Sequence, residues 1–147
     1  MKLPDITDKN VLIIGCPASG KTYISNLLVD DKHILIHTDD YMSYGYHDSM
    51  YKCLDNILKS EKKTIVEGIQ GYRLLRKGVE LDNYYSDIVI ELIISENKMY
   101  EVYENQREID KAVYLSGFNE MHSKILLDYK LLDNPNPPEW ITIFNKY

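Results

Sequence analysis

The chain has 147 residues, of which 27% are charged and 44% hydrophobic, which is typical of one soluble globular domain. No apolar run approaches the ~20 residues of a membrane-spanning helix, the first residues lack a signal-peptide hydrophobic region, and two cysteines make no disulfide framework. We therefore expect a single cytoplasmic domain over residues 1–147. A net charge of −6 and just three arginines disfavour a protein that binds many nucleic-acid phosphates.

Short apolar runs alternate with helical patterns along the chain, which predicts right-handed βαβ units and an α/β fold with a parallel sheet. In such sheets a ligand binds beyond the carboxyl ends of the strands. Functional residues are therefore expected after the first three strands. The predicted strands are 11–14, 34–36, 65–66, 88–94 and 141–144, and the helical patterns cover 23–28, 50–58, about 95–107 and 121–132.

The clearest motif follows the first predicted strand. The segment Gly15–Thr22 reads G-x-x-x-x-G-K-T, the P-loop pattern, in which backbone N–H groups and a helix N-terminus surround a phosphate. We expect Lys21, on an exposed loop, to reach the β- and γ-phosphates, and the Thr22 hydroxyl to bind Mg²⁺. The alternative is a glycine-containing turn before a helix. The predicted nucleotide-binding residues are Gly15, Cys16, Pro17, Ala18, Ser19, Gly20, Lys21, Thr22 and Tyr23.

A P-loop also occurs in GTPases, motor ATPases and regulatory binders, so a second motif must identify the reaction. GTPases usually carry D-x-x-G at the end of strand three, whereas this strand ends in Val66-Glu67-Gly68. The acidic pair Asp39-Asp40 does follow an apolar strand. A carboxylate there can accept the proton of an attacking hydroxyl. The alternative interpretation is a turn or helix-capping aspartate.

These motifs resemble the P-loop kinase group that includes adenylate, shikimate and gluconate kinases. The pair G-C-P-x-S-G-K-T and Asp39-Asp40-Tyr41 is closest to phage polynucleotide 5′-hydroxyl kinase domains and zeta-toxin-like kinases. The resemblance implies a three-layer P-loop NTP hydrolase fold, a five-stranded parallel sheet of order 2-3-1-4-5 with helices on both faces, and ATP with Mg²⁺ as cofactors. It also implies that Asp39 is the general base and that a short helical lid carries an arginine.

Two positions depart from the polynucleotide kinase pattern. Met42 stands where those kinases place an arginine, and Glu67 ends the third strand where an aspartate is common. Glu67 could hold the Mg²⁺ shell through water or bind an acceptor hydroxyl, while Gln70 and Arg73 could bind the acceptor itself. Turn residues and a solvated helix face are the alternative interpretations of this segment.

The lid is expected over about residues 107–117, and its arginine would be Arg107, which follows the fourth predicted strand. Kinases of this group cover the triphosphate with such a mobile segment. The carboxylates around Arg107 allow the alternative of a surface ion pair, which contributes ~0–1 kcal/mol.

Together these features predict an ATP- and Mg²⁺-dependent kinase that transfers the γ-phosphoryl group to a hydroxyl of a small metabolite, nucleoside or nucleotide. A nucleic-acid kinase, acting on a polynucleotide 5′-hydroxyl or a hydroxylated base, is the first alternative. A non-catalytic nucleotide-binding switch is the second. No membrane partner is expected. The acceptor, the choice between ATP and GTP, the choice between Asp39 and Asp40 as base, and the oligomeric state stay open.

Overall fold

The computed structural model describes residues 3–15, 19–45, 47–81, 86–94, 101, 105–110 and 138–145. Their centre is a five-stranded, entirely parallel sheet of order β2-β3-β1-β4-β5, as predicted. The strand β1 is fully buried, because helices cover both faces of the central strands. The strands are β1 (Val11–Gly15), β2 (His33–His37), β3 (Lys63–Glu67), β4 (Ile88–Ile94) and β5 (Glu139–Asn145).

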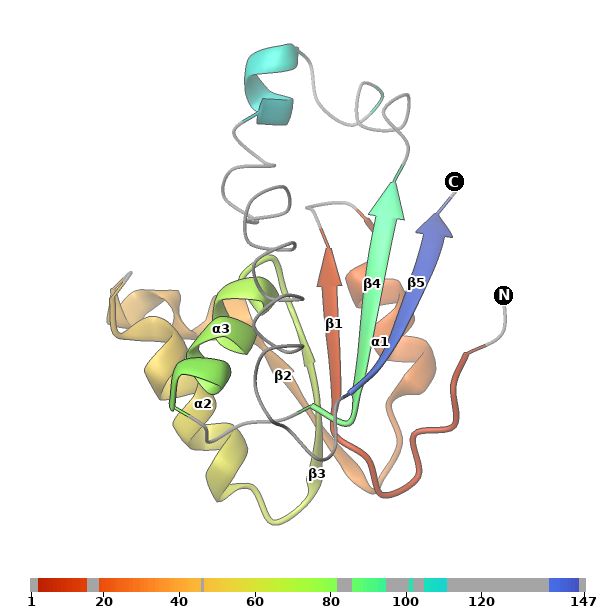
Figure 1. The fold of residues 1–147 in the computed structure, drawn as a ribbon, viewed down its shortest axis with the longest axis vertical. Helices are drawn as coiled ribbons and strands as arrows, with labels where there is room; N and C mark the ends of the chain where they lie inside the picture. The colour runs from red at the N-terminus through yellow and green to blue at the C-terminus, as the bar shows by residue number, and fades with distance from the viewer. Residues whose placement is uncertain are drawn as a thin grey trace.

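Helices cover the sheet from both sides, which gives three layers (Figure 1). On one face α1 (Lys21–Leu28) packs its apolar side on alternate residues of β1, β3 and β4. On the other face lie α2 (Ser49–Lys59) and α3 (Gly71–Leu81). They cover the strand residues that alternate with those under α1. A 3₁₀ helix, η1 (Thr38–Tyr44), connects β2 to the α2 side. Side chains that alternate in direction along each strand thus fill two separate cores.

All five predicted strands are confirmed, and the fourth has the predicted bounds. No helical pattern was predicted over α3, and a solvated helix face was only an alternative interpretation of its first residues. Its apolar residues Tyr72, Leu74 and Leu75 are fully buried, but arginines and lysines interrupt them and obscure the helical period. The helical patterns expected over 95–107 and 121–132, and the lid over 107–117, lie outside the described residues except for 101 and 105–110.

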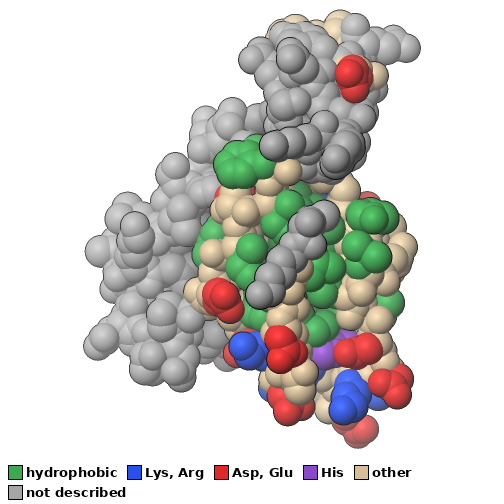
Figure 2. Space-filling view, turned by 90° about the vertical axis from the view of Figure 1, so that its right-hand side faces the viewer, with side chains coloured by type: hydrophobic (Ala, Val, Ile, Leu, Met, Phe, Trp, Pro, Cys, Tyr) green, Lys and Arg blue, Asp and Glu red, His purple; other side chains and the backbone are tan. Residues whose placement is uncertain are grey.

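The two ends of the sheet differ in chemistry. In Figure 2 hydrophobic side chains occupy the middle of the face that is turned to the viewer, and charged side chains gather at its lower end, where the strands begin.

The part of the chain that the structure describes contains no helix with the length and apolarity needed to cross a membrane.

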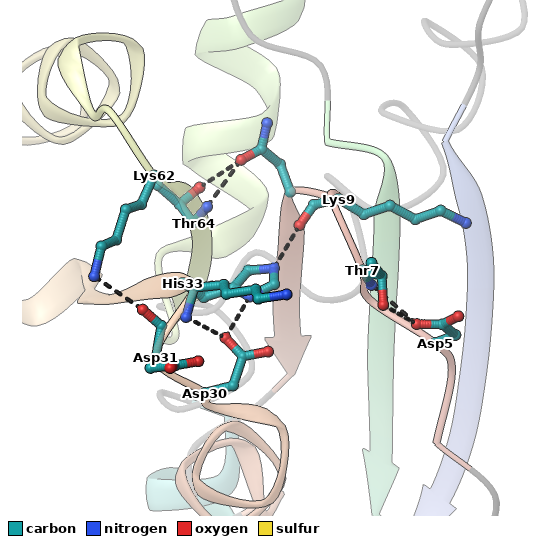
Figure 3. Close-up of polar contacts among 10 residues, drawn as sticks. Asp5, Thr7, Lys9, Asp30, Asp31, His33, Lys62 and Thr64 are labelled. Atoms are coloured by element: carbon teal, nitrogen blue, oxygen red, sulfur yellow. Dashed lines mark hydrogen bonds and ion pairs between the residues drawn. The ribbon is translucent and has the colours of Figure 1, made fainter.

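A polar network joins the segments that enter the sheet at this lower end (Figure 3). The ring of His33 at the start of β2 contacts Asp30 Oδ1 at 2.7 Å and the Lys9 carbonyl oxygen at 2.9 Å. Asn10 Oδ1 accepts the backbone N–H of Thr64 at 2.9 Å. These bonds satisfy polar groups at the amino ends of β1, β2 and β3. The network is therefore structural, and it lies opposite the end where the P-loop motif falls.

Candidate active site

The first part of the site is the junction between β1 and α1, which the P-loop motif spans. Gly20 has φ of 100° and lies in the left-handed region, which favours glycine. A Cβ on Gly15 would lie 2.5 Å from Ser19 Oγ and 2.8 Å from the Leu92 carbonyl oxygen. A side chain at Gly15 would therefore clash with its neighbours, and one at Gly20 would strain the backbone. Residues 16–18, which complete the motif, lie outside the described residues.

Lys21 is the first residue of α1 and is only 7% exposed. The expectation that it lies on an exposed loop is wrong, because the helix begins at this residue and α1 packs on the sheet. The next two residues, Thr22 and Tyr23, are exposed. The carbonyl oxygen of Thr22 accepts the hydroxyl of Ser25 at 2.9 Å, which fixes the first turn of α1.

The second part of the site is the end of β2. Asp39 and Asp40 lie in the first turn of η1, and both are exposed. The hydroxyl of Tyr41 accepts a 2.7 Å hydrogen bond from Asn56 Nδ2 of α2, which anchors η1 on that helix. The two predicted carboxylates therefore lie directly beyond the carboxyl end of β2, with their negative charge in the first turn of a helix, where it is favourable.

The third part is the end of β3, where Glu67 is paired with a residue that the sequence analysis did not select. Glu67 and His37 are direct partners in the parallel pairing of β3 with β2. The Nδ1 of His37 hydrogen-bonds to Oε1 of Glu67. The Glu67 side chain is 9% exposed and that of His37 is 39% exposed. The predicted strand order could have found this pair, because both residues end neighbouring strands at one edge of the sheet.

A second contact joins β2 and β3 one residue further on. Gly68 has φ of +152°, and a Cβ there would lie 1.7 Å from Thr38 Oγ1. Thr38 is fully buried, and its hydroxyl has no hydrogen-bond partner among the described residues. The loop after β3 therefore lies against the first residue of η1, which fixes the two loops relative to each other.

The proposed acceptor-side residues Gln70 and Arg73 lie together at the start of α3. Arg73 Nη1 donates to Gln70 Oε1 at 2.8 Å, and Arg73 is 8% exposed. A Cβ on Gly71 would lie 2.4 Å from Ile14 Cγ2, so this turn is packed directly on β1. The side chains that were interpreted alternatively as a solvated helix face are in fact buried beside the P-loop strand.

A buried carboxylate, also missed from the sequence, lies beneath α3. Glu91 in β4 is 2% exposed. It accepts hydrogen bonds from the hydroxyl of Tyr72 at 2.8 Å and from that of Thr142 at 3.3 Å. These bonds connect α3 to β4 and β5, so Glu91 stabilises the position of the turn that carries Gln70 and Arg73.

Arg107 lies in the described segment 105–110, drawn in cyan beyond the carboxyl ends of the strands (Figure 1). Its side chain is exposed. Asn105 Oδ1 accepts the backbone N–H of Glu108 at 3.0 Å, as in a helix N-cap. Arg107 is therefore in a short helical turn on the side of the sheet where a lid would lie, and residues 111–117 are outside the described residues.

Comparison with solved structures agrees with this architecture. A protein from Chloroflexus aurantiacus that is provisionally described as a kinase matches with a TM-score of 0.51 and 14% identity, over 95% of this chain and 90% of that chain. The similarity between the two chains is a similarity of fold, and it agrees with the strand order of this sheet. The fold is therefore the expected three-layer α/β fold, with a five-stranded parallel sheet of order 2-3-1-4-5.

Two further solved structures match at lower similarity. A gluconokinase from Sinorhizobium meliloti has a TM-score of 0.46 and 12% identity, over 93% of this chain and 82% of that one. Thymidylate kinase from Candida albicans has a TM-score of 0.45 and 13% identity, over 95% of this chain and 85% of that one. No protein-family model matches the sequence, and no curated protein matches it significantly. The similarity to phage polynucleotide kinases and zeta-toxin-like kinases rests on the two sequence motifs.

Proposed function

We propose that this chain is an ATP- and Mg²⁺-dependent kinase that phosphorylates a hydroxyl of a small metabolite, nucleoside or nucleotide. The observation that carries the proposal is the junction of β1 and α1. There Gly15 has no room for a Cβ, Gly20 adopts a left-handed conformation, and Lys21 begins a helix. A helix N-terminus with glycines and a lysine at this spacing is a phosphate-binding arrangement.

The residues at the junction match the groups that a nucleoside triphosphate needs. Lys21 and the N–H groups at the start of α1 would hold the β- and γ-phosphates, and the Thr22 hydroxyl would bind Mg²⁺. The ion, when bound, neutralises charge that develops on the phosphate oxygens. ATP is the donor in this proposal because the sequence contains no N-K-x-D guanine-binding pattern.

The acceptor would lie between η1 and the start of α3. Asp39 accepts the proton of the acceptor hydroxyl as that oxygen forms a bond to the γ-phosphorus. The bond from the γ-phosphorus to the bridging oxygen of ADP breaks, and ADP leaves with the electron pair. Gln70 and Arg73 bind the remainder of the acceptor, and Arg107 stabilises the transferring phosphoryl group.

A small acceptor is favoured over a polynucleotide by charge. The chain carries a net charge of −6, and Met42 stands where the polynucleotide kinases have an arginine. Arginine is the residue best suited to bidentate phosphate contacts. A polynucleotide would also impose a steep dependence of binding on salt concentration.

ADP release in the presence of pooled acceptors tests the proposal. The pools contain sugars and other alcohols, nucleosides, nucleotides, and 5′-hydroxyl oligonucleotides, each with Mg·ATP. We expect one small-molecule pool to stimulate ADP release, and Lys21→Met to abolish the stimulation. Methionine keeps most of the buried aliphatic stem of Lys21, so the fold is retained. Nucleotide binding without stimulation by any pool favours a non-catalytic switch, and stimulation by oligonucleotides alone favours the nucleic-acid kinase.

A further inference from the structure

The last residue pair between β2 and β3 consists of two polar side chains, His37 and Glu67. The register runs from His33 opposite Lys63 to His37 opposite Glu67. A carboxylate has acceptor oxygens only, so the hydrogen bond between the two side chains requires Nδ1 of His37 to carry the proton. Among the described residues, His37 is the one hydrogen-bond partner of the Glu67 carboxylate. Oε1 is thereby fixed, and Oε2 stays available.

Both side chains lie on the α1 face of the sheet. Two residues earlier in each strand, Ile65 belongs to the core cluster that also contains Ile24 of α1, and Leu35 packs against this cluster. Because side chains alternate along a strand with a period of two, His37 and Glu67 project to that same face. Glu67 is also the register partner of a β1 residue two positions before the P-loop begins. The pair therefore lies at the carboxyl edge, on the side where the proposed nucleotide site lies.

The first turn of α1 lies at this same edge and on this same face. Thr22 is its second residue, and α1 packs on both β1 and β3. Mg²⁺ keeps several waters in nucleotide sites and needs one or two protein oxygens. No group of three or more His, Cys, Asp or Glu side chains is close enough to hold a metal in the described ranges. Such a group is not required for an ion that is bound mainly by phosphates and water.

From this arrangement we infer that His37 is a positioning residue, which orients Glu67 so that Oε2 accepts from the water shell of the nucleotide's Mg²⁺. The inference rests on the proposed function. Partners that orient a metal-binding carboxylate or its waters typically change metal affinity by about 10–100-fold when they are removed. Without His37, the Glu67 side chain can rotate between its staggered conformations. It then spends less time in the rotamer whose Oε2 accepts from the water shell of the ion.

Two substitutions separate the hydrogen bond from the shape of the side chain. His37→Phe keeps a ring of similar size and deletes the Nδ1 donor, whereas His37→Asn deletes the ring and keeps an amide N–H at the position of Nδ1. Because the His37 side chain is 39% exposed, neither change should unfold the protein. His33→Asn is the matched control, since His33 lies in the same strand, at the opposite end of the sheet.

The measurement is the affinity of Mn²⁺ in the presence of a saturating non-hydrolysable ATP analogue, read from the electron paramagnetic resonance signal of free Mn²⁺. The affinity of the same analogue in EDTA is measured in parallel. We expect His37→Phe and Glu67→Gln each to weaken Mn²⁺ binding by about tenfold, and the double variant to be no weaker than either alone. His37→Asn should restore most of the affinity, and nucleotide binding in EDTA should be unchanged.

The inference is overturned if His37→Phe leaves Mn²⁺ affinity within twofold of the wild type, or if the two single effects add in the double variant. It is also overturned if His33→Asn weakens Mn²⁺ binding as much as His37→Phe. A loss confined to Asp39→Asn would assign the ion to η1 instead. Absence of any binding of the ATP analogue by the wild type would reject the proposed function itself, which is a distinct result.

Discussion

Gly68, after β3, packs directly against Thr38, after β2. A Cβ on Gly68 would lie 1.7 Å from Thr38 Oγ1, so no larger residue fits between the two loops. Gly68→Ala should therefore destabilise the protein by about 1–3 kcal/mol, the range that overpacking costs. The free energy of unfolding in urea measures the effect.

Two further variants isolate the steric part of that effect. Gly45 also has a positive φ, but an added Cβ there meets nothing within 4 Å, so Gly45→Ala reports backbone strain alone. Thr38→Ala removes a buried hydroxyl that has no partner among the described residues, and it should partly rescue Gly68→Ala. Equal destabilisation by Gly45→Ala and Gly68→Ala would contradict the steric account.

The stability of the network at the amino end should depend on pH through Asp30. Its hydrogen bond from His33, followed by the backbone N–H of Lys32, holds the pKa of Asp30 below its usual 3.8. A carboxyl whose pKa is lowered on folding stabilises the native state above its unfolded pKa, and this stabilisation is lost as pH falls through the folded pKa. Asp30→Asn should therefore lower Tm at pH 6–7, and the difference from wild type should shrink as the pH falls below 3.8.

Asp31→Asn is the control for this titration. Asp31 contributes its backbone oxygen to Lys62 Nζ, and that bond does not depend on its carboxylate. Its Tm should follow the wild type across the whole pH range. A loss of Tm in Asp31→Asn equal to that in Asp30→Asn would point to general surface charge instead of the pair with His33.

Cys53 should behave as a buried, unreactive thiol. It is fully buried in α2, and desolvation raises its pKa to about 12. In a Cys16→Ala background, which leaves Cys53 as the sole cysteine, a disulfide reagent at pH 8 should label Cys53 at the rate of global unfolding. The contribution of this thiol to stability is present below its usual pKa of about 9 and is lost as pH rises towards 12. Rapid labelling of the folded protein would contradict its burial.

The five strands were predictable because apolar runs such as Ile88–Ile94 are typical of strands that are buried on both faces. The helix α3 was not, because its apolar residues are interrupted by charged ones. The P-loop and the acidic pair were equally visible, since each has a fixed local spacing. Contacts between residues distant in sequence were not predictable in this way. His37 with Glu67, Tyr72 with Glu91 and Thr38 with Gly68 depend on register and on how closely α3 packs, which local patterns do not determine.

Arg107 provides a test of the lid. If it acts on charge in the transition state, Arg107→Ala should lower kcat by about 10²-fold or more while the affinity for Mg·ATP changes little. Lys111→Ala, four residues later in the sequence, is the control and should change kcat less. Wild-type values of both kcat and ATP affinity in Arg107→Ala would make Arg107 a surface residue and place the lid elsewhere.

The most direct test of the central claim, that the chain is a kinase whose base is a carboxylate after β2, is acceptor-dependent ADP release by Asp39→Asn compared with Asp40→Asn. Asparagine keeps the size of aspartate but cannot take the proton of the acceptor hydroxyl. We predict that Asp39→Asn lowers kcat by about 10²–10⁴-fold with the affinity for Mg·ATP nearly unchanged, and that Asp40→Asn has a much smaller effect. The reverse pattern would exchange the roles of the two residues. Unaltered acceptor-dependent ADP release in both variants would contradict the mechanism.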